Sequence, residues 1–74
     1  MALSMIHNGM RAVVRRISSG RMLTARLAAM GIVEGSLIMV VSNKGRGPIV
    51  VDLDGTRIAI GRGMAEQIVV EARS

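Results

Sequence analysis

The sequence contains no cysteine and no phenylalanine, tryptophan or tyrosine, and it has a single proline. The missing cysteine excludes disulfides, thiolate metal sites and a cysteine nucleophile. The missing aromatic residues mean that the core must be built from Val, Ile, Leu, Ala and some of the seven methionines. Aromatic side chains bury the largest areas per residue, so their absence leaves a small chain with a weak core. We therefore expect some apolar surface to be buried against a partner.

Long apolar runs and acidic residues are also scarce. No run approaches the roughly 20 residues that a membrane-spanning helix needs, and the N-terminus lacks a basic flank and a cleavage pattern. We therefore expect a cytoplasmic protein that does not span the membrane.

Ten Lys and Arg stand against five Asp and Glu, a net charge of +5. That charge is compatible with nucleic acid, an anionic membrane or an acidic partner, and also with ordinary solubility.

Residues 1–74 are expected to form one domain, because the chain has no room for a second core. Leu23, Leu27 and Met30 are spaced for one face of a short helix, which Ser19 or Gly20 can cap at its N-terminus. Gly31 follows the last periodic residue, as a helix C-terminal cap requires. A second glycine, Gly35, precedes the next strand.

Strands are predicted at residues 10–17, 36–42, 49–53, 56–60 and 68–71 from alternating apolar residues. The alternation breaks near Arg15 and Arg16, which predicts a β-bulge. Asp54-Gly55 predicts a two-residue hairpin turn that pairs Asp52 with Arg57 in an exposed ion pair. Residues 61–67 are expected to form a turn or one helical turn with Ala65 inward. The result is a mostly β fold, a small barrel of the SH3 or OB kind with one helix between its first two strands.

The strand at residues 36–42 is apolar on both faces. Ile38 and Val40 share one face, and Leu37, Met39 and Val41 share the other, where a half-exposed strand should carry polar residues. Either both faces are covered, or the second face is an apolar patch for a partner or for a second copy of the chain. We take Leu37, Met39 and Val41, together with the helix and its Arg26, as the candidate contact surface.

No catalytic set is evident, since the five acids are scattered and His7 is the only histidine. We therefore expect no enzymatic activity and no cofactor. The methionines are interpreted as adaptable packing. Any divalent metal would bind weakly, with His7 and Glu34 as the candidate ligands.

Nucleic-acid binding is a further alternative. Arginines could contact phosphates, but a small barrel that binds single strands normally also stacks bases on aromatic residues, and this chain has none. The candidate phosphate contacts are Arg15, Arg16, Arg46 and Arg62.

Several segments resemble the FeoA family of small ferrous iron transport proteins. The opening places Leu3, Ile6 and Gly9 at the family's spacing, and residues 26–35, RLAAMGIVEG, resemble its helix ending in Leu-xx-Met-Gly-Leu/Ile-x-Pro-Gly. The hairpin and the closing segment from Ala65 follow the same pattern. One departure is Glu34, which stands where the family usually has proline and should loosen that turn.

The resemblance implies an SH3-like barrel with a cytoplasmic, non-enzymatic role in bacterial ferrous iron uptake. The implied partner is FeoB, a membrane permease that carries its own GTPase domain. The fold also resembles the C-terminal SH3-like domain of iron-dependent repressors, so a metal-sensing domain is an alternative to a transport accessory.

Overall fold

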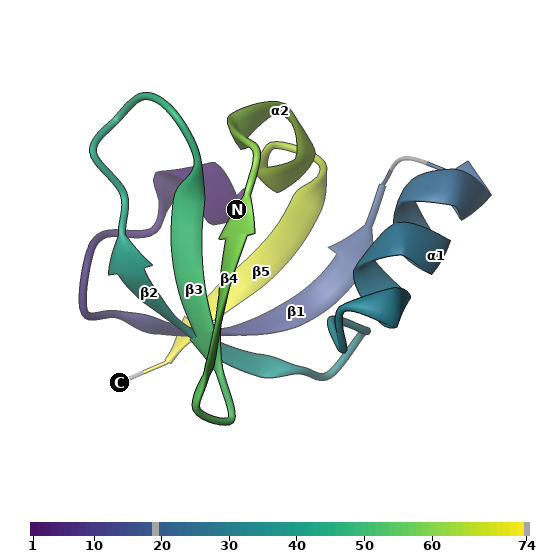
Figure 1. The fold of residues 1–74 in the computed structure, drawn as a ribbon, viewed down its shortest axis with the longest axis horizontal. Helices are drawn as coiled ribbons and strands as arrows, with labels where there is room; N and C mark the ends of the chain where they lie inside the picture. Colours follow the sequence, from purple (N-terminus) through teal and green to yellow (C-terminus); the bar gives the residue numbers. More distant parts are fainter. Residues whose placement is uncertain (19, 74) are drawn as a thin grey trace.

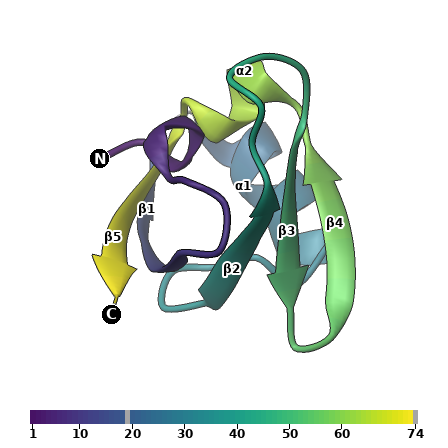
Figure 2. The same cartoon turned by 90° about the vertical axis from the view of Figure 1, so that its left-hand side faces the viewer.

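The computed structural model describes residues 1–18 and 20–73, which fold around one antiparallel sheet of five strands. The sheet order is β4-β3-β2-β1-β5, so β4 and β5 form its two edges (Figures 1 and 2). The strands are β1 (Arg11–Ile17), β2 (Leu37–Ser42), β3 (Ile49–Leu53), β4 (Thr56–Ile60) and β5 (Ile68–Arg73). The curled sheet and the helix between its first two strands confirm the predicted small SH3-like fold.

Three short helical segments complete the fold. They are the 3₁₀ helix η1 (Leu3–Met5), the helix α1 (Gly20–Ala29) and the single turn α2 (Arg62–Ala65). Gly20 is the first residue of α1, whereas Ser19, the other candidate for the N-terminal cap, lies outside the described residues. α1 lies beside β1 in Figure 1 and behind the sheet in Figure 2. No helix within residues 1–18 and 20–73 is long and apolar enough to cross a membrane.

The core is entirely aliphatic. Strand residues that alternate inward supply most of it, Leu3 and Ile6 add the N-terminal segment, and Ala65 points inward as predicted. Leu27 is the only fully buried residue of α1. The buried apolar residues are Leu3, Ile6, Ala12, Val14, Leu27, Ile32, Ile38, Val40, Ile49, Val51, Ile60, Ala65, Ile68 and Val70.

The C-terminus of α1 is closed by a Schellman motif. The Ile32 N–H donates to the Leu27 carbonyl at 2.8 Å, and the Gly31 N–H donates to the Ala28 carbonyl at 2.9 Å. Gly31 has a φ of 89°, the left-handed conformation that this cap requires, so its predicted role is confirmed. Ile32 and Leu27 are both fully buried, which gives the motif its usual apolar contact.

Met30 was expected on the buried face of the helix, and this is wrong. The helix ends at Ala29, and the Met30 N–H bonds to the Leu27 carbonyl three residues back, so the last turn is tighter than an α-helix. That tightening turns the Met30 side chain outward, where it is 36% exposed. Leu23 does pack against the core, although it is only partly buried.

Residues 33–36 form a hydrogen-bonded turn between α1 and β2. The Ser36 N–H donates to the Val33 carbonyl at 3.0 Å, and Gly35 has a φ of 92°. These two features define a type II turn with Glu34 at its second position, where proline is common. The Val33 N–H also donates to the Ser36 hydroxyl at 2.9 Å. Glu34 therefore sits in a turn that two hydrogen bonds close, with glutamate at the position where proline is common.

The β3–β4 hairpin has the predicted register, with Leu53 opposite Thr56, Asp52 opposite Arg57 and Ile49 opposite Ile60. The predicted Asp52–Arg57 ion pair is absent from the ion pairs of the described residues. Asp52 instead accepts a hydrogen bond from the Gly55 N–H at 3.0 Å, so the hairpin turn engages its carboxylate.

The predicted bulge in the first strand is confirmed. The pairing of β1 with β5 shifts register between Val14 and Arg16, at the position where the apolar alternation of the sequence breaks. The extra residue lets Val14 and Ile17 both face the protein interior.

The methionines are mostly on the surface rather than in the core. Six of the seven are at least 36% exposed, from Met30 at 36% to Met22 at 81%, and Met64 packs against the core only in part. The expectation that they serve mainly as packing is therefore wrong. Flexible, polarizable side chains at this exposure are typical of adaptable contact surfaces.

Replacing Leu27 with alanine should destabilise the fold by about 2–5 kcal/mol, because it removes the only fully buried side chain of α1 and leaves a cavity. Urea denaturation measures the change. Met22→Ala on the same helix is the matched control, and at 81% exposure it should change stability by less than about 0.5 kcal/mol. Equal effects for the two variants would contradict the assigned packing of α1.

Glu34→Pro should stabilise the protein by about 0.4–1 kcal/mol, because proline fits the second position of a type II turn and restricts the unfolded chain. Thermal unfolding followed by circular dichroism measures it. Val33→Pro is the control and should destabilise, since it removes the N–H that donates to Ser36. A loss of stability in Glu34→Pro would contradict the turn type.

Candidate functional site

Two apolar side chains lie next to each other on the outer face of the sheet. In β2, Ile38 and Val40 are buried, whereas Leu37 is 49% exposed and Met39 is 39% exposed. Leu37 pairs with Val13 of β1, whose side chain is on the same outer face. We call Leu37 and Met39 the sheet-face patch. It is the part of the predicted contact surface that the structure places on one face.

Val41 is not a regular member of this patch. The pairing of β2 with β3 runs from Met39–Asp52 to Val40–Val51 and then jumps to Ser42–Val50. Val41 is thus the extra residue of a bulge, and the alternation that placed it beside Met39 is interrupted there. Its side chain is partly buried, so the prediction of three residues in one exposed row is wrong for Val41.

Charged residues flank the sheet-face patch on both sides. Met39 lies opposite Arg11 of β1 and opposite Asp52 of β3 in the paired register. Leu37, Met39, Arg11 and Asp52 help to line a shallow hollow of about 250 Å³, together with Asp54. An apolar centre with a polar rim is the usual arrangement of a protein–protein contact.

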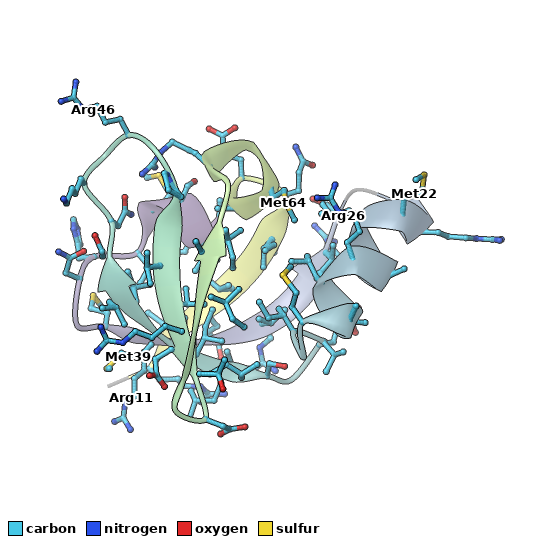
Figure 3. All side chains as sticks on the ribbon, in the orientation of Figure 1. Arg11, Met22, Arg26, Met39, Arg46 and Met64 are labelled. Carbon is cyan, nitrogen blue, oxygen red and sulfur yellow. The ribbon has the colours of Figure 1, made fainter. Side chains whose placement is uncertain are left out.

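Arg26, the fourth predicted contact residue, lies on a different surface. In Figure 3, Arg26 and Met22 are on α1 at one side of the molecule, whereas Met39 and Arg11 are at the opposite side. Arg26 lines a groove of about 380 Å³ between α1 and α2. The structure therefore divides the predicted surface into the sheet-face patch and this α1–α2 groove.

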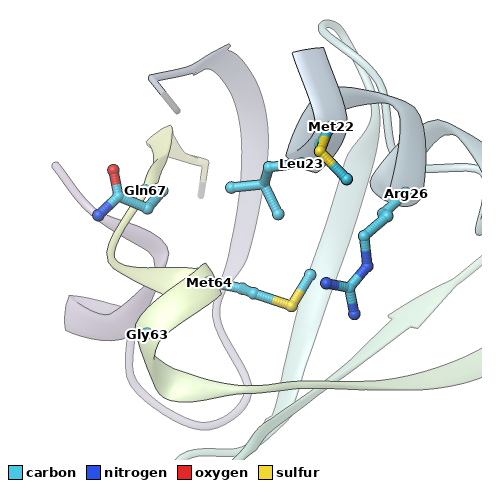
Figure 4. Close-up of a pocket in the computed structure, with 6 residues that line it drawn as sticks. All are labelled: Met22, Leu23, Arg26, Gly63, Met64 and Gln67. Carbon is cyan, nitrogen blue, oxygen red and sulfur yellow. The ribbon is translucent and has the colours of Figure 1, made fainter. Parts of the chain in front are cut away.

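The α1–α2 groove combines apolar side chains with one cation. Leu23 and Met64 pack partly against the core, and Met22 is 81% exposed at the rim. In the close-up, Leu23 points into the groove and the Arg26 guanidinium extends toward the end of Met64 (Figure 4). Gly63 and Gln67 complete the lining. Sequence reasoning missed Met22 and Met64, since helical spacing does not show which segment faces α1.

A polar network that the sequence did not indicate fastens the loop at residues 43–48. The Asn43 side-chain amide donates to the Ser4 and Ile6 carbonyls at 2.9 and 2.8 Å. The Arg62 guanidinium donates to the Asn43 side-chain oxygen at 2.7 Å and to the Gly47 carbonyl at 3.1 Å. The network ties the N-terminal segment and α2 to the loop after β2, and it gives Arg62 a structural role.

Two of the four arginines considered for phosphate contacts are engaged within the fold. Arg62 belongs to the loop network, and Arg15 forms a 2.8 Å ion pair with Glu71. The hydrogen bond and charge of Arg15 hold the pKa of Glu71 below its usual value, with a smaller contribution from Arg73. Arg16 and Arg46 are exposed.

The two candidate metal ligands lie in different parts of the fold. His7 lies in the segment after η1 and lines a surface hollow with Ser4, Met5 and Asn43. Glu34 lies in the turn before β2. Within residues 1–18 and 20–73, no group of three or more His, Asp or Glu side chains is arranged to hold a metal ion.

Comparison with known proteins gives consistent matches. A family model described as the FeoA domain matches residues 1–72. The chain is 39% identical over 69 residues to Fe(2+) transport protein A of Methanocaldococcus jannaschii, covering 93% of this chain and 83% of that protein.

Solved structures agree with these sequence matches. A crystal structure of Iron Uptake Regulatory Protein (FeoA) superimposes with a TM-score of 0.88 and 32% identity, covering 97% of this chain and 95% of that one. A manganese-dependent transcriptional repressor in complex with manganese superimposes with a TM-score of 0.89 and 26% identity, covering 99% of this chain but 36% of the repressor. With a family model that matches nearly its full length and relatives that share about a third of its residues, this chain belongs to the FeoA family.

Proposed function

We propose that this chain is a non-enzymatic accessory protein of ferrous iron uptake that docks on the cytoplasmic side of a FeoB-type membrane permease. Membership of the FeoA family supports a role in iron transport, and the relative from Methanocaldococcus jannaschii is named for Fe(2+) transport. The docking partner and the cytoplasmic location are our proposals from the family resemblance.

The sheet-face patch is the observation that carries this proposal. Regular strands with one face toward water normally place polar residues there, yet Leu37 and Met39 are 49% and 39% exposed in the middle of the sheet. Burying these side chains against a partner removes apolar surface from water at about 25 cal/mol per Å². Arg11 and Asp52 at its rim can fix the orientation of the partner without requiring a buried charge.

The polar groups of the described residues support an interaction role over catalysis. Asp52 accepts a hydrogen bond within the hairpin turn, Glu71 pairs with Arg15, and Arg62 fastens the loop after β2. Each of these groups maintains a local structure, and none of these bonds sets an acid beside a base in a cavity.

A metal-sensing function is the second candidate. The similarity to the manganese-dependent repressor, with a TM-score of 0.89, favours it, because the same fold forms about a third of that regulator. Titration with Fe²⁺ or Mn²⁺, both paramagnetic, while the amide signals are monitored would support this candidate if signals broaden or shift around one site until saturation, and exclude it if no signal changes.

Replacing Leu37 and Met39 together with threonine should weaken binding to the purified permease at least about tenfold, because central apolar contacts contribute most of the binding energy of an interface. Threonine keeps the β-propensity of the strand, so the fold should be retained. Calorimetric titration into permease reconstituted in nanodiscs measures the affinity.

Met5→Thr is the control, since Met5 is 64% exposed in η1 and lines a different hollow from that of the sheet-face patch, so the affinity of this variant should match the wild type. Unchanged affinity in the double variant would exclude the sheet-face patch as the contact. A wild-type chain that does not bind the permease at all would contradict the proposed function itself.

A further inference from the structure

The α1–α2 groove is a second surface with the properties of a binding site. It has a volume of about 380 Å³ and is formed by two segments far apart in the sequence, one on α1 and the other on α2 and the turn that follows. Figure 3 places its residues Arg26 and Met64 on the side of the molecule away from Met39. The groove and the sheet-face patch can therefore be occupied independently.

The floor and rim of the groove are apolar and accessible. Leu23 and Met64 pack against the core from below, so their positions are fixed by the fold. Met22 stands above them at 81% exposure, and its unbranched thioether can adjust to the shape of an incoming side chain. Gly63 has open space where a side chain would stand, so the α2 wall of the groove is low. This geometry suits an aliphatic side chain that enters from the side.

The charge of the groove is positive and uncompensated. Arg26 is the only charged residue among the six that line it, and no acidic side chain is among them. The described residues make no hydrogen bond or ion pair with the Arg26 guanidinium. A guanidinium presents a planar set of donors that matches a carboxylate in two parallel hydrogen bonds. The net charge of +5 adds a general attraction for acidic segments.

We infer that the α1–α2 groove binds an acidic segment of a protein partner, with an aliphatic side chain seated against Leu23, Met22 and Met64 and a neighbouring carboxylate paired with Arg26. This inference goes beyond the docking of the sheet-face patch and does not depend on it. The position of the cation beside the apolar floor sets the specificity, because a segment must supply both groups at adjacent positions.

Charge reversal tests this assignment directly. Two fluorescein-labelled peptides are titrated with the folded chain, and fluorescence anisotropy reports binding. One peptide is composed of leucine and glutamate, and the matched peptide is composed of leucine and lysine. The wild type should bind the glutamate peptide and discriminate against the lysine peptide. Arg26→Glu should weaken binding of the glutamate peptide at least about tenfold and gain binding of the lysine peptide, because the pairing charge is inverted.

Arg46→Glu is the matched control, since it makes the same change in net charge at an exposed loop residue outside the groove. It should bind the glutamate peptide nearly as well as the wild type does. Met22→Ser should weaken binding of the glutamate peptide while the backbone spectrum stays folded.

Equal losses of affinity for the glutamate peptide in the Arg26 and Arg46 variants would overturn the proposal, because they would show that the overall charge of the chain attracts the peptide. Failure of the wild type to bind the glutamate peptide would overturn it as well. The Leu37→Thr, Met39→Thr double variant separates the two proposals, since it should keep its affinity for the peptide while losing its affinity for the permease. A loss of peptide binding in that variant would contradict an independent groove.

Discussion

The burial of Leu27 and Ile32 at the end of α1 is the interaction on which the rest of the structure depends. Both side chains are fully buried, and Gly31 between the helix and Ile32 permits the reversal that brings them together. Space at Gly31 is also limited, since an added Cβ would lie 3.1 Å from the Leu53 side chain of β3. In a core without aromatic residues, this small aliphatic contact holds the helix against the sheet.

With the helix fixed in this way, the fold presents two unlike surfaces. The outer face of β2 exposes Leu37 and Met39 in a flat setting with charges of both signs around them. The side of α1 toward α2 forms a groove with one cation, Arg26. A flat apolar patch suits a broad contact with a folded partner, whereas a groove suits a single segment of chain. We propose that one small domain in this way holds a large partner and a flexible segment at the same time.

The sequence predicted features that depend on local backbone chemistry. The turn at Asp54, the helix stop at Gly31 and the register of the hairpin follow from positive φ angles and strand alternation. Two features that depend on distant contacts were not predicted. The bulge at Val41 arises from pairing with β3, and the separation of Arg26 from the strand face depends on which side of the sheet α1 packs. The FeoA resemblance was predictable because the order of its small and aliphatic residues covers nearly the whole chain, residues 1–72.

We propose that the sheet-face patch contacts the permease. The methionines supply probes for it, because Met39 lies in the patch, Met22 in the α1–α2 groove and Met5 in neither. The direct measurement is a methyl NMR spectrum of the chain, labelled at methionine methyl groups, with and without reconstituted permease. The account predicts that the Met39 signal shifts or broadens selectively while the Met5 signal does not. An unchanged Met39 signal in the presence of bound permease would contradict it.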